Sequence, residues 1–445
     1  MTGAVPSVDT AAAEGYVPPS AAARRYALLL LFLAYVVNYI DRQIVTILQE
    51  PIRADLGLSD TQLGLMTGLS FALFYATLGV PIARIADRRS RSKLIAGAIT
   101  LWSAMTAACA AATSFWTLLL CRMGVGVGEA GLSPPAHSLI SDYYEPERRA
   151  TALAIYSVGI QVGVFLGFVA GGAINHYFGW RMAFLVVGLP GLLLALLIRF
   201  TMREPPRGQF DPPSATLSYG EQGGGKGLRA LWSVRAFRYA ALACGFHALV
   251  LYGHGHWAPP YLARVHGMAL SEIAFWLAIL AVLPGALGIW VSGMVSDRLE
   301  QRAGWGRLRV ASISVLLLMP FEIAYALAPN EAAALTLSAV THFLGGFYLA
   351  PTIAFVHGQV GARQRASASA ILLLCLNLIG LGIGPLLVGS LSDLASAEGL
   401  GGDGIRYALL AIIPSQLIAL ALFRQADQAH RADTATETQF RKATS

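Results

Sequence analysis

The feature that most constrains this chain is a series of twelve long apolar runs that extends along almost its whole length. A helix needs roughly 20 apolar residues to cross the hydrocarbon core of a bilayer. The runs are continuous, whereas the strands of a membrane barrel are about 10 residues long and alternate in polarity. We therefore expect an all-α membrane protein. The twelve predicted spans are 26–50, 62–86, 93–113, 115–141, 148–177, 181–200, 236–264, 271–297, 307–328, 332–360, 366–393 and 405–424.

The composition agrees with this class of protein. Of the 445 residues, 56% are hydrophobic and 13% are charged, whereas a soluble domain has about 25% charged residues. The apolar runs recur throughout the chain, which excludes a soluble domain with a single membrane anchor. The net charge of +7 is spread over several loops. A nucleic-acid partner is therefore not expected, because such partners require a concentrated basic face.

The basic residues predict how the chain is oriented. Most of the 32 Lys and Arg fall in the two tails and in the loops on the same side of the membrane as those tails. Only Arg53, Arg181, Arg264 and Arg406 lie near the other side. By the positive-inside rule, both termini are cytoplasmic, which agrees with an even number of spans. We expect a multi-pass protein of a bacterial-type inner (plasma) membrane.

A hydrophilic segment divides the chain into two halves. Residues 201–235 contain four prolines and three consecutive glycines, so they predict a flexible cytoplasmic linker. The linker separates an N-terminal bundle of six helices, 26–200, from a C-terminal bundle of six, 236–424. The polar segments 1–25 and 425–445 are expected to be disordered cytoplasmic tails.

The two halves share a motif at matching places. Asp87-Arg88 follows the second span with Arg91 close behind, and Asp297-Arg298 follows the eighth span. In both cases a small residue precedes the Asp by four positions. Such repeats are typical of secondary transporters, and these acids and bases are predicted to form a cytoplasmic gate that closes in one state and opens in another. The alternative is that both segments are ordinary basic loops.

Four charged residues are predicted to lie inside the membrane, where ionisable side chains are costly and usually functional. Asp41 and Arg42 belong to the first span, and Arg122 and Glu129 belong to the fourth. From the helical rise, Asp41 lies ~22 Å from the cytoplasmic end of its span and Arg122 lies ~10 Å from the outer end of its own. In a core ~30 Å thick these two reach similar levels. Glu129, two turns further along, lies nearer the cytoplasm.

These positions suggest a mechanism of proton coupling. Asp41 is predicted to pair with Arg122, and a rearrangement that breaks the pair would increase the affinity of Asp41 for a proton. Glu129, which lies nearer the cytoplasm, is predicted to be a second protonation site that is accessible from that side. Ser133, one turn past Glu129, is a candidate polar contact for a substrate. The alternatives are a fixed structural salt bridge and a serine bonded to its own backbone.

Other residues predict packing rather than chemistry. Glycines at spacing four in the fifth span form one smooth face for close helix contact, and glycines around Pro385 predict that the eleventh span is irregular. His254 and His256 diverge on a helix, and the four cysteines lie within spans. We therefore expect no metal, no cofactor and no enzyme activity. The glycine face consists of Gly159, Gly163, Gly167 and Gly171.

These motifs resemble a known family. The loops of Asp87 and Asp297 resemble the repeated motif of the major facilitator superfamily, although Ala83 and Ser90 stand where that family usually has glycine. Further segments resemble its spinster branch, the lysolipid and sphingolipid transporters. Organic anion symporters of the same superfamily share part of the pattern and remain an alternative. The segments are Asn38 to Arg42, Arg122 to Ala130, Ser141-Asp142 and Gly179-Trp180-Arg181.

The resemblance implies a secondary active transporter that works by alternating access, as a monomer, on a small amphipathic or anionic substrate. A member of the spinster branch would be a proton-coupled carrier of amphipathic lipids. Its partners would be protons and the surrounding membrane lipids. Asp41 and Glu129 would then exchange protons. Arg42 and Arg122 would contact a phosphate or carboxylate headgroup, since a guanidinium group suits both. The alternative is a proton-coupled carrier of organic anions or drugs.

Overall fold

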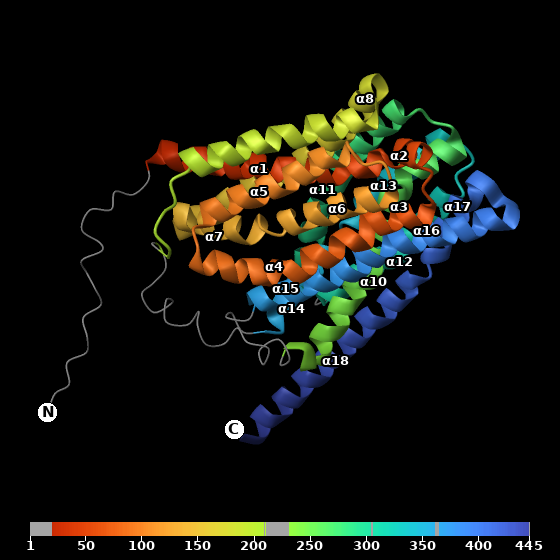
Figure 1. Cartoon of the computed structure of the whole chain (residues 1–445). Coiled ribbons are helices and arrows are strands. Elements are labelled where there is room, and N and C mark those ends of the chain that lie inside the picture. The colour runs from red at the N-terminus through yellow and green to blue at the C-terminus, as the bar shows by residue number, and fades with distance from the viewer. Residues whose placement is uncertain (1–19, 209, 211–230, 304–305, 361–364, 445) are drawn as a thin grey trace.

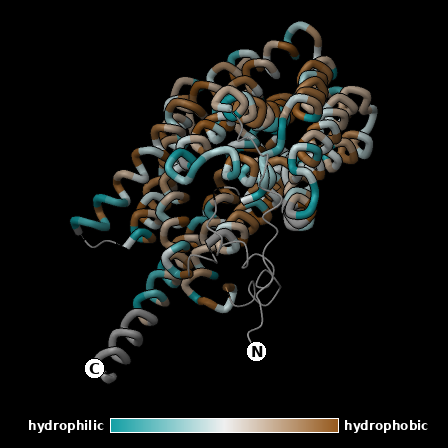
Figure 2. Tube along the Cα trace, turned by 90° about the vertical axis from the view of Figure 1, so that its left-hand side faces the viewer, coloured by the Kyte–Doolittle hydropathy of each residue, from teal (hydrophilic) through white to brown (hydrophobic). Residues whose placement is uncertain are grey.

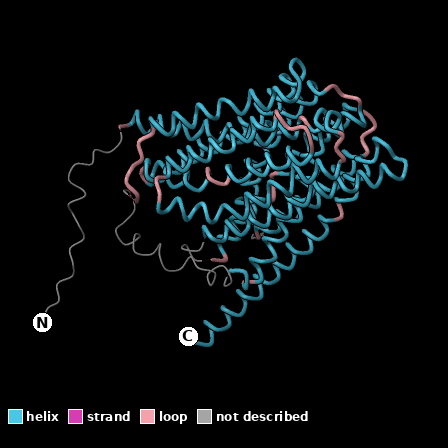
Figure 3. Tube along the Cα trace, in the orientation of Figure 1, coloured by secondary structure: helices cyan, strands magenta, loops and turns pink. Residues whose placement is uncertain are grey.

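The computed structural model describes residues 20–208, 210, 231–303, 306–360 and 365–444. Throughout these residues the chain is helical, with short connections and no strand (Figure 3). The all-α prediction is therefore confirmed. Viewed from the side where the termini lie, many hydrophilic stretches are on the loops that face the viewer, while apolar residues run along the helices (Figure 2).

The first half runs from α1 to α8 (Figure 1). Its elements are α1 (Ala21–Ile47), α2 (Gln49–Leu56), α3 (Asp60–Gly64), η2 (Leu65–Leu69), α4 (Ser70–Arg88), α5 (Arg91–Cys109), α6 (Phe115–Glu129), α7 (Ser133–Tyr143) and α8 (Pro146–Thr201).

The second half runs from α10 to α18, after a segment of which 211–230 lies outside the described residues. Its elements are α10 (Arg235–His266), α11 (Leu270–Ala303), α12 (Arg307–Ala326), α13 (Glu331–Gly345), α14 (Leu349–Gly358), α15 (Arg365–Cys375), η5 (Leu376–Ile383), α16 (Gly384–Ala395), η6 (Ser396–Leu400), η7 (Gly401–Asp403), α17 (Gly404–Ile412) and α18 (Ser415–Thr444).

The helices account for the predicted membrane crossings. Among the described residues, eight helices are long and apolar enough to span a membrane. Two of these, Pro146–Thr201 with 56 residues and Ser367–Ala432 with 66, are long enough for two crossings each. The second and fourth predicted spans are divided between shorter helices. We call the side where α1 begins the terminal side, and the side that holds α2 and α3 the opposite side (Figure 1).

Glycine and proline accompany the breaks in the helices. Gly179 has φ +79° inside α8, a backbone conformation that glycine adopts without steric cost, and it separates the fifth crossing from the sixth. The helix of the fourth span ends at Glu129 and restarts at Ser133 with proline in its first turn. The eleventh span contains the π-helix η5, which confirms the predicted irregularity.

One expected tail is structured. Residues 425–444, predicted to be disordered, continue α18 as an unbroken helix, so that prediction was wrong. The segment has no glycine or proline, and its five Ala and three Gln are strong helix formers. Residues 1–19 of the other predicted tail lie outside the described residues.

The glycine face of α8 packs directly on α1. A methyl group on Gly163 would lie 2.6 Å from the carbonyl oxygen of Val36 and from Cβ of Tyr39. Gly167 and Gly171 meet Gln43 and Ile47 at similarly short distances, one and two turns further along. This contact holds α1, and with it the charged residues in its middle, in a fixed position within the first half.

We expect Gly163→Ala to lower the stability of the protein. The added methyl group overlaps the backbone of α1, and overpacking of this kind costs about 1–3 kcal/mol. The midpoint of thermal unfolding in detergent micelles measures the effect. Gly97→Ala in α5 is the matched control, because its methyl group meets nothing within 4 Å. An equal midpoint for both variants would contradict the packing role.

Candidate functional site

The structure brings the four predicted membrane charges together. Nε of Arg42 in α1 donates a hydrogen bond to Oε2 of Glu129 in α6 at 2.7 Å. Nη1 of Arg122 donates to the main-chain carbonyl oxygen of Asp41 at 3.4 Å. Asp41, Arg122 and Glu129 are each exposed by 1% or less, so these charges are out of contact with water.

The pairing within this cluster differs from the prediction. The carboxylate of Asp41 forms no ion pair with Arg122, and Arg42 instead pairs with Glu129. Consecutive residues of a helix point about 100° apart, so Asp41 and Arg42 point in different directions. Arg42 faces α6, whereas Asp41 lies beside the hydroxyl of Thr106 in α5 without a hydrogen bond of normal geometry.

Several polar atoms of the cluster have no partner. Within the described residues, neither carboxylate oxygen of Asp41 accepts a hydrogen bond, and Oε1 of Glu129 and Nε of Arg122 are also unpaired. Buried polar groups are normally hydrogen-bonded, and exceptions call for an explanation. The cluster therefore retains capacity to bind a proton or a polar ligand group.

Aromatic rings surround the guanidinium group of Arg42. The centroids of Tyr39, Phe71 and Tyr75 lie 5.1, 4.8 and 4.9 Å from it, distances typical of cation–π contacts. Its side chain is 19% exposed, so Arg42 is the member of the cluster that solvent can reach. Ser133, predicted with Arg42 and Arg122 to contact the substrate, begins α7 and is partly buried.

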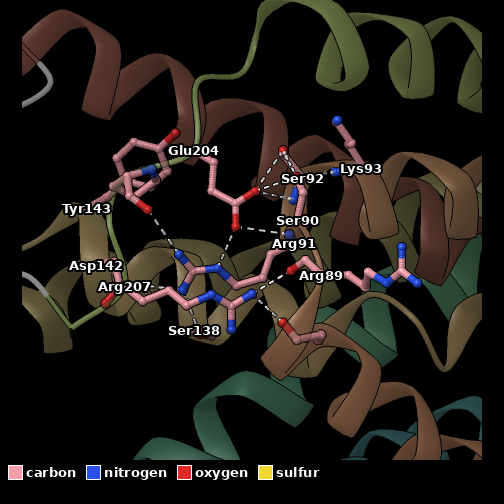
Figure 4. A network of polar contacts seen from close by, with 12 residues as sticks. Arg89, Ser90, Arg91, Ser92, Lys93, Ser138, Asp142, Tyr143, Glu204 and Arg207 are labelled. Carbon is pink, nitrogen blue, oxygen red and sulfur yellow. Dashed lines mark hydrogen bonds and ion pairs between the residues drawn. The ribbon is translucent and has the colours of Figure 1, made fainter. Parts of the chain in front are cut away.

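On the terminal side, Arg91 anchors a polar network (Figure 4). It pairs with Asp142 of α7 and with Glu204, which it meets at 2.9 Å just after α8. Burial would raise the pKa of Glu204, but hydrogen bonds from Ser90 and Arg91 outweigh it and lower the pKa to about 2. All these residues belong to the first half, so Arg91 here ties the beginning of the linker to its own bundle.

The remaining predicted gate residues are not engaged between the halves here. Arg88, Asp297 and Arg298 are exposed and form no ion pair within the described part of the chain. The side chain of Asp87 lies outside the described residues. A cytoplasmic gate formed by these residues therefore remains a prediction.

The ion pairs between the halves lie instead on the opposite side, in a cluster that we call the interlock. Arg264 of α10 reaches Asp60 at 2.6 Å and Glu50 at 2.5 Å, both in the first half. Asp393 of α16 accepts hydrogen bonds from the backbone amides of Asp60 and Thr61, at 2.9 and 2.7 Å. The interlock therefore joins α2 and α3 to α10 and α16.

Other contacts close the same side. The hydroxyl of Ser392 donates to Asp60 at 2.6 Å, and Nε2 of Gln49 donates to the carbonyl oxygen of His256 at 2.6 Å. Among the described residues, every hydrogen bond and ion pair between the halves lies at or near this side. The structure is closed on the opposite side. Sequence reasoning missed the interlock, although Arg264 stood out as one of few basic residues there.

The described residues contain no group of three or more His, Cys, Asp or Glu side chains arranged to hold a metal ion. His254 and His256 diverge as expected. Nε2 of His254 meets the carbonyl oxygen of Leu409 at 3.2 Å, whereas Nδ1 of His256 meets the hydroxyl of Thr46 at 3.3 Å.

Two helical halves that meet at one side, with buried charges between their helices, define a multi-pass membrane transporter. A family model described as the Major Facilitator Superfamily matches residues 31–305. The chain therefore belongs to this superfamily, and it is a transporter rather than an enzyme.

The similarities are distributed over several kinds of carrier. The chain is 31% identical to an MFS-type efflux pump of Mycolicibacterium smegmatis, covering 97% of this chain and 98% of that one. It is 28% identical to a hexuronate transporter of Bacillus subtilis, covering 87% and 93%. It also matches the inward-facing, unoccupied crystal structure of a bacterial homologue of the human lysosomal transporter spinster, with TM-score 0.86, 33% identity and coverage of 93% and 99%. The predicted resemblance to the spinster branch is confirmed.

We expect Arg264→Ala to open the interlock. Asp60 is 1% exposed and keeps Arg53 of its own half, at 3.2 Å, when Arg264 is removed. The change therefore costs the hydrogen bonds of Arg264 to charged groups, about 1.5–3 kcal/mol, which changes a two-state ratio by at least about tenfold. Spin labels at Ala54 and Ala397, in a cysteine-free background, would report a longer distance distribution. Arg406→Ala is the control, because Arg406 pairs with Asp403 at 3.8 Å within one half. An unchanged distribution in Arg264→Ala would show that the interlock does not hold this side shut.

Proposed function

We propose that the protein is a proton-coupled secondary transporter that moves an amphipathic lipid, of the lysophospholipid or sphingoid type, by alternating access across a bacterial inner membrane. It acts as a monomer with both termini in the cytoplasm. The observation that carries the proposal is the central cluster, in which a buried carboxyl group without a partner lies next to one that is half paired.

Asp41 is the first proton site in this proposal. An ionised carboxylate without hydrogen bonds is costly to bury, and protonation removes that cost. Arg122 already binds the main-chain carbonyl oxygen of the same residue. A change in the rotamer of the Arg122 side chain would bring its guanidinium group to the carboxylate, which would then release its proton. Proton exchange is thereby linked to a side-chain rearrangement inside the first half.

Glu129 and Arg42 link the proton to the substrate. Their pair is short, at 2.7 Å, and Arg42 is the part that solvent reaches. An anionic headgroup that binds Arg42 competes with Glu129, because charge-assisted hydrogen bonds to guanidinium are strong for phosphate and carboxylate alike. Once displaced, the buried Glu129 is the better proton acceptor. The rings of Tyr39, Phe71 and Tyr75 offer apolar surface to the chain that follows the headgroup.

The closed interlock fits one state of this cycle. With both termini in the cytoplasm, closure on the opposite side corresponds to the inward-facing state. The spinster homologue with TM-score 0.86 is also inward-facing. The exposed Asp297 and Arg298 on the terminal side are in keeping with a cytoplasmic gate that is open here. Such a gate would engage when the interlock releases.

We expect Asp41→Asn and Glu129→Gln each to abolish uptake driven by a proton gradient in proteoliposomes. Both changes keep the shape of the side chain but remove the titrating group, so proton exchange stops while the fold remains. Thermal unfolding of each variant checks the fold, and Glu398→Gln, at an exposed acid in the second half, is the control. Full activity in both variants would exclude proton coupling through this cluster.

A second candidate function is transport of organic anions or drugs. The similarity to an efflux pump over almost the whole chain supports it, as does the similarity to a hexuronate transporter. The chemistry at Arg42 would be the same in both cases. The two functions differ in whether the site also binds an acyl chain. The dependence of affinity on the length of that chain distinguishes them.

For a lipid substrate we expect binding to tighten with chain length in a series of lysophosphatidic acids. Each buried CH2 contributes about 0.8 kcal/mol, or roughly fourfold in affinity per carbon until the site is filled. Displacement of a fluorescent lysolipid from the purified protein measures this, with glucuronate as the anion without a chain. Affinity that is independent of chain length, together with binding of glucuronate, would favour the organic-anion function instead.

A further inference from the structure

The second half contains a cavity that the proposed transport cycle does not use. It has a volume of about 210 Å³ and lies between α10, α12 and α13. A water molecule occupies about 30 Å³, so the cavity has room for a small organic group. Its lining includes no residue of α1 or α6, which separates it from the cluster around Asp41. The polar lining residues are His254, Glu322, Tyr325, Ser338, Thr341 and His342.

Glu322 contributes a buried carboxyl group to the lining of this cavity. It is 1% exposed, and its Oε2 accepts a hydrogen bond from Nε2 of Gln416 at 2.6 Å. The residues that line the cavity include no Lys or Arg, and Glu322 forms no salt bridge within the described chain. A buried acid without a cation is costly, and inside a membrane it indicates a functional site.

His254 and His342 each offer one ring nitrogen as a hydrogen-bond acceptor. Nδ1 of His342 contacts the main-chain carbonyl oxygen of Ser338 at 2.8 Å, and Nε2 of His254 contacts that of Leu409 at 3.2 Å. A carbonyl oxygen only accepts, so these nitrogens carry the hydrogens. In the neutral ring the other nitrogen is then an acceptor. Neither of these remaining nitrogens has a hydrogen bond within the described residues.

The hydroxyl groups add further acceptor capacity. Thr341 donates its hydrogen to the carbonyl oxygen of Ser338 at 3.0 Å, which leaves the lone pairs of its oxygen. The hydroxyl of Tyr325 is buried, with the residue only 3% exposed, and has no partner among the described residues. Carboxylate, imidazole and hydroxyl acceptors without an opposing cation require a ligand that brings both positive charge and hydrogen-bond donors.

We propose that this cavity binds a primary ammonium group at the end of a short alkyl stem. An ammonium group has three donors and no acceptor, and its hydrogen bonds to Glu322 would be charge-assisted and strong. The ring of Tyr325 offers a cation–π contact. The stem has space at Gly255, where a methyl group would meet nothing within 4 Å. The site is independent of the proposed lipid transport.

The test is binding of n-butylammonium to the purified full-length protein in detergent micelles, by calorimetry at constant ionic strength. Two probes serve as comparisons: tetramethylammonium has the charge but no donors, and n-butanol has a similar stem but no charge. We expect saturable binding of n-butylammonium only. Absence of saturable binding, or equal binding of tetramethylammonium, would overturn the proposal and indicate a cavity that holds water only.

Single substitutions test where on the protein n-butylammonium binds. Glu322→Gln removes the charge and is expected to weaken n-butylammonium binding at least tenfold, whereas Glu398→Gln, at an exposed acid of the same half, leaves it unchanged. Asp41→Asn should also leave it unchanged. Binding that survives Glu322→Gln but is lost in Asp41→Asn would assign the cation to the central cluster and refute the site proposed here.

Two further variants decide the question if Glu322→Gln does not fold. Gly255→Leu places a side chain in open space and is expected to block binding while the thermal unfolding midpoint stays near that of the wild type. Tyr325→Phe removes only the unpartnered hydroxyl and is expected to weaken binding severalfold. Unchanged affinity in both would overturn the proposal.

Discussion

The cost of burying a charged side chain in a membrane governs this structure. Arg42 and Glu129 meet this cost by pairing within one half. Arg264 and Asp60 meet it by pairing between the halves, and Glu322 relies on a neutral amide alone. The three arrangements differ in what they allow. In the proposed transport cycle a substrate enters the first pair and the second contact opens, and in the proposed ammonium site the third side chain binds the ligand.

Where the pairs lie determines how the halves can move. On the terminal side the network of Arg91 stays within the first half, whereas on the opposite side Arg264 and Asp393 bind across the interface. The glycines of α8 hold α1 firmly in the first half. Opening of the opposite side therefore has to separate α2 and α3 from α10 and α16, with α1 moving as part of its own bundle.

The candidate pivot residues for such a movement are glycines that lie at or beside two π-helices. η2 and η5 come from the two halves and lie against each other. A methyl group on Gly68 would come within 2.8 Å of the carbonyl oxygen of Leu381, and one on Gly64 would come still closer to the carbonyl oxygen of Pro385. π-Helices often occur at functional positions. These glycines allow the backbones of the two halves to lie in close contact, and we place the pivot of the movement there.

The sequence predicted which charges would meet but not how they would pair. Helical rise gives the depth of Asp41 and Arg122, and depth sufficed to bring the cluster together. It does not give the direction in which each side chain points, so the partner of Glu129 was missed. The helical continuation at 425–444 was missed because polarity was taken as a sign of disorder, although the residues favour a helix.

The interlock shows the same limit. The four basic residues near the opposite side could be counted in the sequence, and the structure gives each an acidic partner. For Arg264 the partners come from the other half, about 200 positions away in the chain, and nothing local indicates them. The cavity of Glu322 depends on the packing of three helices and has no sequence signal beyond one unassigned acid. The pairs are Arg53–Asp60, Arg181–Asp55, Arg264 with Glu50 and Asp60, and Arg406–Asp403.

A polar closure of this kind suits a protein that has to reopen. The side chains of Arg264 and Glu50 are already 12% and 24% exposed in the closed state, and water can solvate them fully once the halves separate. A largely buried ion pair gains little net free energy, because the lost hydration of both charges offsets much of their attraction. The open and closed states can therefore remain close in free energy. Opening an apolar interface of the same size would expose its apolar surface to water, which costs free energy in proportion to the area. Such an interface would therefore hold the opposite side shut.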